Sequence, residues 1–256
     1  MRIDFSKYQA TGNDFMLVDN REKQFPEHDN ELIARLCHRK FGIGADGLIL
    51  LQNHEDFDFE MVYFNADGKP GSFCGNGSRA AVRFAEFLGM VKLKARFLAA
   101  DGLHEAWISP ESIQVKMIDV DKMIPTEFGF FLDTGSPHVI IPVDNLVFAD
   151  VDSLGKKVRH DPIFFPGGTN VNFVSFKGTG IQVRTYERGV EAETLSCGTG
   201  VTASALASTQ YGKSSPVNVE TPGGMLEVTF NTHEGIFDQI YLSGAAIKVF
   251  DGHINL

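Results

Sequence analysis

The stretches SFCGNGSRAAV (Ser72–Val82) and LSCGTGVTASA (Leu195–Ala205) share one order of residues: cysteine, glycine, a polar residue, glycine, and then a segment of helical composition. The two motifs lie 123 residues apart, and so do Thr11-Gly12 and Thr134-Gly135. Two short matches at one spacing are typical of an internal repeat. The chain is therefore predicted to contain two copies of a unit of about 120 residues. A single domain with accidental echoes is the alternative.

The composition is that of a globular protein. Its 256 residues are 43% hydrophobic, which is enough to form one large core or two medium ones. A formal net charge of -10 disfavours nucleic acid and anionic membranes as partners, because both bind cationic surfaces. The N-terminus lacks the apolar run of a signal peptide, and no later run is long enough to span a bilayer. The cytoplasm is the expected location, where the three cysteines would be thiols.

The local patterns predict many strands and few helices. Strand-like segments are rich in aromatic and β-branched residues and end at turn residues, as in FMLVD, GLILLQ, FDFEMVYF and HVIIPVD. Helices are expected over residues 30–40, 78–88 and 201–211. The last has small side chains on nearly every side, which suits a helix enclosed by a sheet.

These patterns predict an α+β fold of two pseudo-symmetric domains, each a curved, mostly antiparallel β-sheet wrapped around a central helix. The expected domains are residues 1–119 and 120–246. The tail, residues 247–256, is left over and can return to the first domain.

The helix expected at residues 30–40 accounts for one cysteine. Asn30 is a suitable N-cap, and Leu32, Ile33, Leu36 and Cys37 fall on one face. Cys37 is therefore predicted to be a core residue, which leaves the cysteines of the two glycine motifs for chemistry.

A glycine-rich turn ahead of a helix can bind an anion. The first N–H groups of a helix have no intrahelical partner, and the helix dipole favours a carboxylate at that end. A cysteine at the same place has a lowered thiol pKa and can act as a base. If two such motifs face each other across a cleft, their thiols lie on opposite sides of one ligand. That arrangement suits racemisation at a carbon atom.

Other uses of paired cysteines fit the spacing less well. A zinc site normally needs four ligands at close spacing, so no metal is expected. A nucleophilic cysteine with a histidine base explains only one of the two motifs. A redox dithiol normally has its cysteines two residues apart. A phosphate-binding loop needs a lysine after the last glycine, and neither motif has one.

The motifs together resemble the diaminopimelate epimerase family over essentially the whole chain. ATGNDF (10–15), FGIGADG (41–47), FNADG, CGNG, GSPH (135–138), TNVNF (169–173) and YERGVEAETLSCGTG occur in the family's order. The resemblance implies epimerisation of LL-diaminopimelate to meso-diaminopimelate, in lysine and peptidoglycan biosynthesis. It implies no cofactor, and a small-molecule substrate as the partner; a homodimer is left open.

The resemblance also implies roles for individual residues. Cys74 and Cys197 match the family's acid/base pair, and His138 and Glu187 match groups that help to move protons to and from the thiols. The positions that match substrate-binding residues are Asn13, Asn65, Gly75, Asn76, Asn170, Glu187, Arg188, Gly198 and Thr199. Asn13 and Asn65 could instead be turn residues that satisfy their own backbones. Arg188 could instead form a structural ion pair with Glu187.

Two positions depart from the family's pattern. Ser136 stands where the family often has asparagine, and Gly47 where it often has glutamine. Rival functions are a proline or hydroxyproline racemase, an isomerase of the phenazine-biosynthesis type, and an amino-acid-binding protein without activity. The cysteine pair argues against the phenazine type, and Arg188 argues against a substrate that lacks a distal carboxylate.

Overall fold

The computed structural model describes residues 2–71, 73–164, 166–176 and 178–255. The chain divides into two compact units: Met1–Val115 with Gly244–Leu256, and Lys116–Ser243. Strands dominate both units, and the described residues contain four α-helices. None of these helices is long and apolar enough to cross a membrane.

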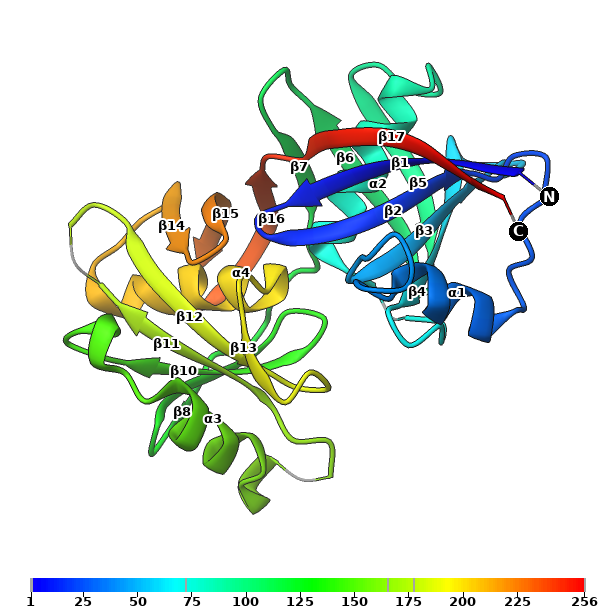
Figure 1. Cartoon of the computed structure of the whole chain (residues 1–256). Helices are drawn as coiled ribbons and strands as arrows, with labels where there is room; N and C mark the ends of the chain where they lie inside the picture. Colours follow the sequence, from blue (N-terminus) through cyan, green and yellow to red (C-terminus); the bar gives the residue numbers. More distant parts are fainter. Residues whose placement is uncertain (1, 72, 165, 177, 256) are drawn as a thin grey trace. The chain divides into compact units, whose positions relative to one another are not determined.

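The first unit contains one sheet and two α-helices (Figure 1). Its elements are β1 (Arg2–Ala10), β2 (Asn13–Asp19), α1 (Asn30–Cys37), β3 (Gly47–Gln52), β4 (Phe59–Asn65), α2 (Gly75–Phe87), β5 (Lys94–Ala99), β6 (Gly102–Ile108), β7 (Ile113–Lys116) and β17 (Ile247–Asn255).

The described residues of the second unit also contain two α-helices, together with three short 3-10 helices. Its elements are β8 (Ile124–Thr126), β9 (Gly129–Asp133), β10 (Pro137–Pro142), η1 (Leu146–Phe148), α3 (Val151–Arg159), η2 (Pro162–Phe164), β11 (Asn170–Ser175), β12 (Ile181–Glu187), β13 (Ala192–Thr194), α4 (Gly198–Ala207), η3 (Ser208–Tyr211), β14 (Val217–Thr221), β15 (Gly224–His233) and β16 (Ile236–Gly244).

The two units repeat one pattern of strand pairing. In the first, β1–β2 is antiparallel, β2–β3 parallel, β3–β4 antiparallel, β4–β5 parallel and β5–β6 antiparallel. In the second, the series β9–β10–β11–β12–β14–β15 follows the same alternation. The helices also correspond, because α1 and α3 precede the second strand of a parallel pair, and so do α2 and α4. The predicted fold of two pseudo-symmetric, sheet-dominated domains with few helices is confirmed.

Each unit has a central helix packed against its sheet. Helix α2 is buried along most of its length and contributes to a core formed with β1 to β6. Helix α4 is buried from Val201 to Ala207, and its side chains there are mostly small. Small side chains let the strands approach the helix closely, as its composition predicted.

For the two smaller helices, the structure corrects one predicted N-cap and adds one helix that was not predicted. The buried residues of α1 are Leu32, Ile33, Leu36 and Cys37, as predicted. Its N-cap, however, is Asp29 and not Asn30, because the Asp29 carboxylate accepts the Leu32 N–H at 2.9 Å. Helix α3 was not predicted. Its central Gly155 weakens the helical pattern, but a Cβ there would lie 2.6 Å from the Cβ of Tyr186, so close packing on β12 requires glycine.

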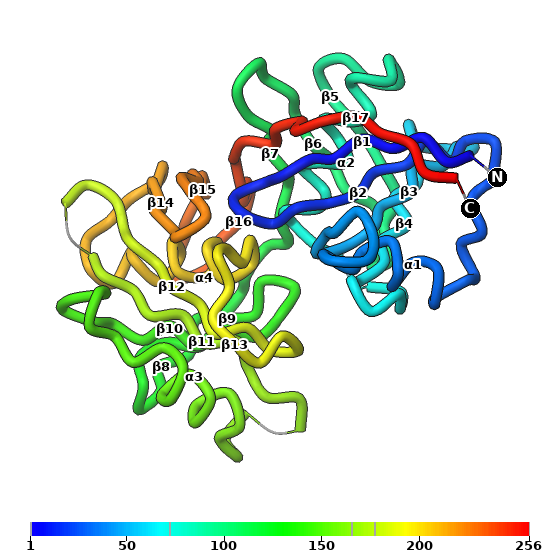
Figure 2. The backbone as a smooth tube through the Cα atoms, viewed as in Figure 1, coloured from blue at the N-terminus to red at the C-terminus, as the bar shows by residue number. Residues whose placement is uncertain are grey.

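The C-terminal strand completes the sheet of the first unit. Strand β17 pairs antiparallel with β1, from Arg2 opposite Asn255 to Gln9 opposite Ile247. Figure 2 shows this red end of the tube beside the blue N-terminal strand. The two ends of the chain are therefore hydrogen-bonded neighbours in one unit.

Candidate active site

Each glycine motif places its cysteine at the N-cap of a central helix. Cys74 precedes α2 with φ -122° and ψ 109°, and Cys197 precedes α4 with φ -115° and ψ 112°. The Gly77 N–H points at the Cys74 sulfur, 3.4 Å away. Cys74 is half-buried and Cys197 buried, and neither is in a disulfide. Both cysteines thus occupy the N-cap position of a central helix, and the Cys74 side chain accepts a cap hydrogen bond, whereas that of Cys197 makes no such bond.

The glycines after each cysteine allow close packing. A Cβ at Gly200 would lie 2.3 Å from Asn172 Oδ1 and 3.2 Å from the His138 ring. A Cβ at Gly77 would lie 3.2 Å from Ile49 Cδ1 and 3.4 Å from Met61 Cε. The helix turn therefore rests on polar groups in the second unit and on apolar groups in the first.

A hydrogen-bond chain holds Asn13 and Asn76 in the first unit. Asn76 Nδ2 donates to Asn13 Oδ1, and Asn13 Nδ2 donates to Asp46 Oδ2 at 3.1 Å. Asn76 Oδ1 accepts from Arg79 Nη2 at 2.8 Å and from Thr11 Oγ1 at 3.3 Å. The Asn13 side chain therefore links Asn76 to Asp46, and it does not hydrogen-bond to the backbone of its own turn.

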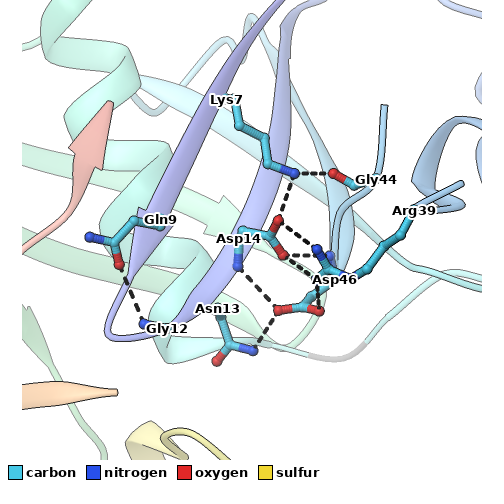
Figure 3. A network of polar contacts seen from close by, with 8 residues as sticks. All are labelled: Lys7, Gln9, Gly12, Asn13, Asp14, Arg39, Gly44 and Asp46. Carbon is cyan, nitrogen blue, oxygen red and sulfur yellow. Dashed lines mark hydrogen bonds and ion pairs between the residues drawn. The ribbon is translucent and has the colours of Figure 1, made fainter. Parts of the chain in front are cut away.

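Behind Asn13 lies a cluster of charged side chains (Figure 3). Asp14 pairs with the buried Lys7 at 2.7 Å and with Arg39 at 2.6 Å, and Arg39 also reaches Asp46 at 2.7 Å. Burial has the largest single effect on the pKa of Asp14 and raises it, but hydrogen bonds from Arg39 and Lys7 outweigh burial and bring the pKa down to about 2. The cluster is thus ionised, and it fixes the Asp46 carboxylate that holds Asn13.

Asn65 closes a turn with its backbone. Its N–H donates to Lys69 O and its carbonyl accepts from the Gly68 N–H, each at 2.9 Å. Within the described part of the chain the Asn65 side-chain amide makes no hydrogen bond, and the residue is exposed. The amide is therefore available to a ligand.

In the second unit, a hydroxyl links His138 to the cysteine. His138 Nε2 lies 2.8 Å from Thr199 Oγ1, and Thr199 Oγ1 lies 3.5 Å from Cys197 Sγ. The Thr134 hydroxyl donates to the Thr199 carbonyl at 2.9 Å and holds the same residue from the other side. The imidazole thus reaches the thiol through Thr199.

The surroundings of His138 fix its charge and tautomer. Asn172 Nδ2, which can only donate, lies 3.1 Å from His138 Nδ1, so Nδ1 accepts and Nε2 carries the hydrogen. The amide orientation is fixed by the Thr185 hydroxyl, which donates to Asn172 Oδ1 at 2.8 Å. Complete burial, with a smaller effect from Arg188, lowers the pKa of His138 to about 3. The ring is therefore neutral at neutral pH.

Glu187 and Arg188 do not pair with each other. The Thr194 hydroxyl donates to Glu187 Oε2 at 2.9 Å, and burial raises the pKa of the Glu187 carboxyl. Arg188 Nη2 lies 3.5 Å from Ser136 Oγ, and no carboxylate of the described residues forms an ion pair with it. The alternative of a structural ion pair is thus wrong, and the Arg188 guanidinium can bind an external carboxylate.

Asn170 uses its whole side-chain amide inside the protein. Its Nδ2 donates to Ser136 Oγ and to the Pro137 carbonyl, each at 3.0 Å, and its Oδ1 accepts the Arg188 N–H at 2.8 Å. Asn170 therefore joins the strand that carries His138 to the turn that carries Arg188.

Several residues of these networks were not predicted from the sequence, among them Asn172, Thr185 and Arg79. The alternation of TNVNF places Asn172 on the same face of its strand as Asn170, which was a usable signal. No pattern marked Thr185, whose partner Asn172 lies 13 residues earlier in the sequence. No pattern marked Arg79 either, because its burial depends on how α2 packs on the sheet.

Comparisons with known proteins agree on one family. The family model for diaminopimelate epimerase matches residues 5–122 and 130–249. The diaminopimelate epimerase of Flavobacterium psychrophilum is 48% identical over 96% of this chain and 97% of its own length. That of Chlorobaculum tepidum is 44% identical over 96% of this chain and 99% of its own.

Solved structures show the same fold at low identity. A Bacillus anthracis protein of the PhzF family, described as a phenazine biosynthesis protein, superposes with a TM-score of 0.80 at 15% identity, with all of both chains covered. A hydroxyproline epimerase from Agrobacterium vitis superposes with a TM-score of 0.66 at 14% identity, with 100% of this chain and 93% of that chain covered. At such identities the likeness concerns the fold alone.

Proposed function

The chain belongs to the diaminopimelate epimerase family, and we propose that Cys74 and Cys197 are the acid/base pair with which it converts LL-diaminopimelate to meso-diaminopimelate. This epimerisation is a step of lysine biosynthesis. The observation that carries the proposal is the matched position of the two cysteines, each at the N-cap of a central helix.

In the proposed reaction, one cysteine removes the α-proton as a thiolate and the other delivers a proton to the opposite face of the carbon. Charge that develops on the substrate's α-carboxylate is stabilised by N–H groups of the first turns of α2 and α4, contributed by Gly75, Asn76, Gly198 and Thr199. Each cycle exchanges the protonation states of the two thiols, so the carbon is inverted without a cofactor.

We assign a supporting role to the residues around Cys197. Because His138 is neutral and donates to Thr199, the Thr199 hydroxyl can direct its own proton at the Cys197 sulfur. This hydrogen bond favours the thiolate. Glu187, with its raised carboxyl pKa, can hold a proton near neutrality more readily than an exposed glutamate. His138, through Thr199, and Glu187 would thereby ease proton movement to and from the thiol.

Substrate recognition needs groups for two amino-acid ends. Arg188 has no protein carboxylate as a partner within the described ranges, and its planar guanidinium suits the distal carboxylate. The exposed amide of Asn65 and the fixed amide of Asn13 are the proposed donors and acceptors of the first unit. Asn170 is proposed to act at the site as well, by holding Ser136 and the Arg188 backbone.

We further propose that the two compact units are two domains that arose by duplication of one ancestral unit. We also propose that the enzyme works in the cytoplasm. The unit boundaries, 115/116 and 243/244, lie close to those expected from the repeat, 119/120 and 246/247. A homodimer is a further proposal, which the molecular mass in solution would test.

The decisive experiment follows isotope and stereochemistry together. The protein is incubated with LL-diaminopimelate in deuterium oxide without added cofactor. Two separate bases should place solvent deuterium in the meso product much faster than in recovered substrate, whereas equal early labelling would indicate a single base. Cys74→Ala and Cys197→Ala should each abolish epimerisation. Cys37→Ala is the matched control and should retain it, because Cys37 is a core residue whose thiol pKa is raised by burial to about 11.

A further inference from the structure

Arg79 is a fully buried cation in the first unit. Its guanidinium is 0% exposed and lies against the first turn of α2, where Nη1 donates to Gly75 O at 3.3 Å and Nη2 donates to Thr11 Oγ1 and Asn76 Oδ1, each at 2.8 Å. Its Nε has no hydrogen-bond partner, and no ion pair joins it to a carboxylate of the described residues. A buried charge without a counter-charge is costly. Its presence therefore calls for an explanation.

The group beside Arg79 that can become an anion is Cys74, which begins the same helix turn. Arg79 lies five residues after Cys74 and bonds to both residues that follow the cysteine. Burial lowers the pKa of Arg79 to about 10, and the one titratable group that opposes this effect is the Cys74 thiol. At that pKa the guanidinium is still charged at neutral pH.

The position in the second unit that is equivalent to Arg79 carries no cation. The residue five positions after Cys197 is Thr202, whose hydroxyl donates to the Gly198 carbonyl at 3.0 Å, much as Arg79 donates to Gly75. Cys197 has the Thr199 hydroxyl beside it instead. Around the first-unit motif the side chains that approach Gly77 are the apolar Ile49 and Met61, which cannot stabilise a thiolate. The two cysteines are therefore supported in different ways.

We propose that Arg79 is the buried counter-charge of the Cys74 thiolate, and so a positioning residue that keeps this cysteine ready to act as a base. The inference rests on the proposed function of Cys74. An uncompensated cation in a dry environment favours ionisation of a nearby thiol. The hydrogen bonds to Asn76 and Thr11 hold the guanidinium in place at the helix terminus.

Most other ionisable groups on the elements packed against α2 have partners of their own. Lys7 pairs with Asp14, Arg83 with Glu86, and His104 with Asp101, and Tyr63 packs edge-on to Phe15. Tyr8 packs on Phe84, and burial raises its phenol pKa to about 12. Glu105 pairs with Lys94, Arg2 with Asp4 and Asp19 with Arg21, and Glu60 is half-buried. Among these groups Arg79 is the cation engaged with the cysteine motif itself.

The test measures the protonation of each thiol and not turnover. The rate of alkylation by iodoacetamide is followed against pH for Cys74 and Cys197 in one sample, by peptide mass spectrometry. Arg79→Met should raise the Cys74 midpoint by about one pH unit or more, since one nearby opposite charge is lost. Arg79→Lys should keep it close to the parent value. The Cys197 midpoint should stay unchanged in both variants and also in Thr202→Val, the matched control at the equivalent position.

If Arg79→Met does not fold, Arg79→Gln is used as the neutral variant. The glutamine amide carries no charge but can replace hydrogen bonds to Asn76 and Thr11. If the lysine and glutamine variants raise the Cys74 midpoint equally, or neither raises it, the charge is irrelevant and the proposal is overturned. Such a result would leave the proposed function intact. Epimerisation that survives in Cys74→Ala would overturn the proposed function instead.

Discussion

His138 Nε2 lies 2.8 Å from Thr199 Oγ1, and that hydroxyl in turn lies 3.5 Å from the Cys197 sulfur. Since Asn172 donates to His138 Nδ1, the ring proton sits on Nε2 and points at Thr199. His138 therefore affects Cys197 by orienting a hydroxyl, and a neutral imidazole is sufficient for that purpose.

Removal of this hydroxyl should slow the chemical step. Thr199→Val keeps the shape of the side chain but breaks both hydrogen bonds, and a bond to a charged group is worth about 1.5–3 kcal/mol. We expect kcat to fall about 10- to 100-fold with little change in KM. Thr199→Ser should restore most of the activity. Steady-state kinetics of the three proteins would check this, and equal kcat values in the valine and parent enzymes would contradict the relay.

His138 should not titrate near neutral pH. Its folded pKa of about 3 lies below the unfolded value of about 6.5, so the unfolded chain binds the proton first. Its contribution to stability is therefore present above pH 6.5 and is lost as the pH falls toward 3. NMR of the histidine ring protons should show no midpoint for His138 between pH 5 and 8. A midpoint for His138 in that range would mean that the ring is not buried as described.

Arg188 should contribute to substrate binding and contribute little to the stability of the fold. Arg188→Met should raise KM or lower kcat/KM by an amount corresponding to about 2–5 kcal/mol, because a desolvated substrate carboxylate loses its partner. Arg184→Met is the matched control, since Arg184 already pairs with Glu193 at 2.6 Å. That control should reduce thermal stability and leave kcat/KM nearly unchanged. The reverse pattern would remove Arg188 from the recognition of the distal carboxylate.

The Lys7–Asp14 pair should stabilise the first unit in a pH-dependent way. Asp14→Asn leaves the buried Lys7 without its counter-charge, which costs about 3–5 kcal/mol when a buried pair is broken. The folded pKa of about 2 lies below the ordinary value of 3.8, so this stabilisation is present above pH 4 and is lost as the pH falls from 4 to 2.

Urea unfolding at several pH values would measure the effect, and the difference between parent and Asp14→Asn should shrink by about 2 kcal/mol across that window. Asp19→Asn is the control, because Asp19 and Arg21 form a pair at the surface and should contribute less than about 1 kcal/mol. A difference between parent and Asp14→Asn that does not depend on pH would show that Asp14 is not ionised by its neighbours.

The sequence was most informative where backbone geometry depends on a few neighbouring residues. The Cys-Gly motifs predicted a helix after each cysteine, but both helices begin three residues earlier than expected, at Gly75 and Gly198, so that the cysteines themselves are the N-cap residues. The side-chain spacing in α1 predicted its buried face, although the neighbouring Asp29 took the cap expected of Asn30. Local rules thus located elements well and their exact ends less well.

The contacts among the supporting residues could not be predicted, because strand register brings these residues together. His138, Asn172 and Thr185 belong to three strands and meet only because β10 pairs with β11 and β11 with β12. The burial of Arg79 likewise depends on how α2 packs on the sheet. The partners that set the charge of a side chain were therefore found in the structure alone.

The different residues five positions after the two cysteines make the two halves of the chain non-interchangeable parts. A chain built from two first halves would carry two thiols with arginine beside them and none with a hydroxyl relay, and two second halves would give the opposite. In either symmetric chain both thiols would depend on the same kind of support. Divergence of the copies would thus give each thiolate its own means of stabilisation, a buried cation in one half and an oriented hydroxyl in the other, so that a change that weakens one leaves the other in place.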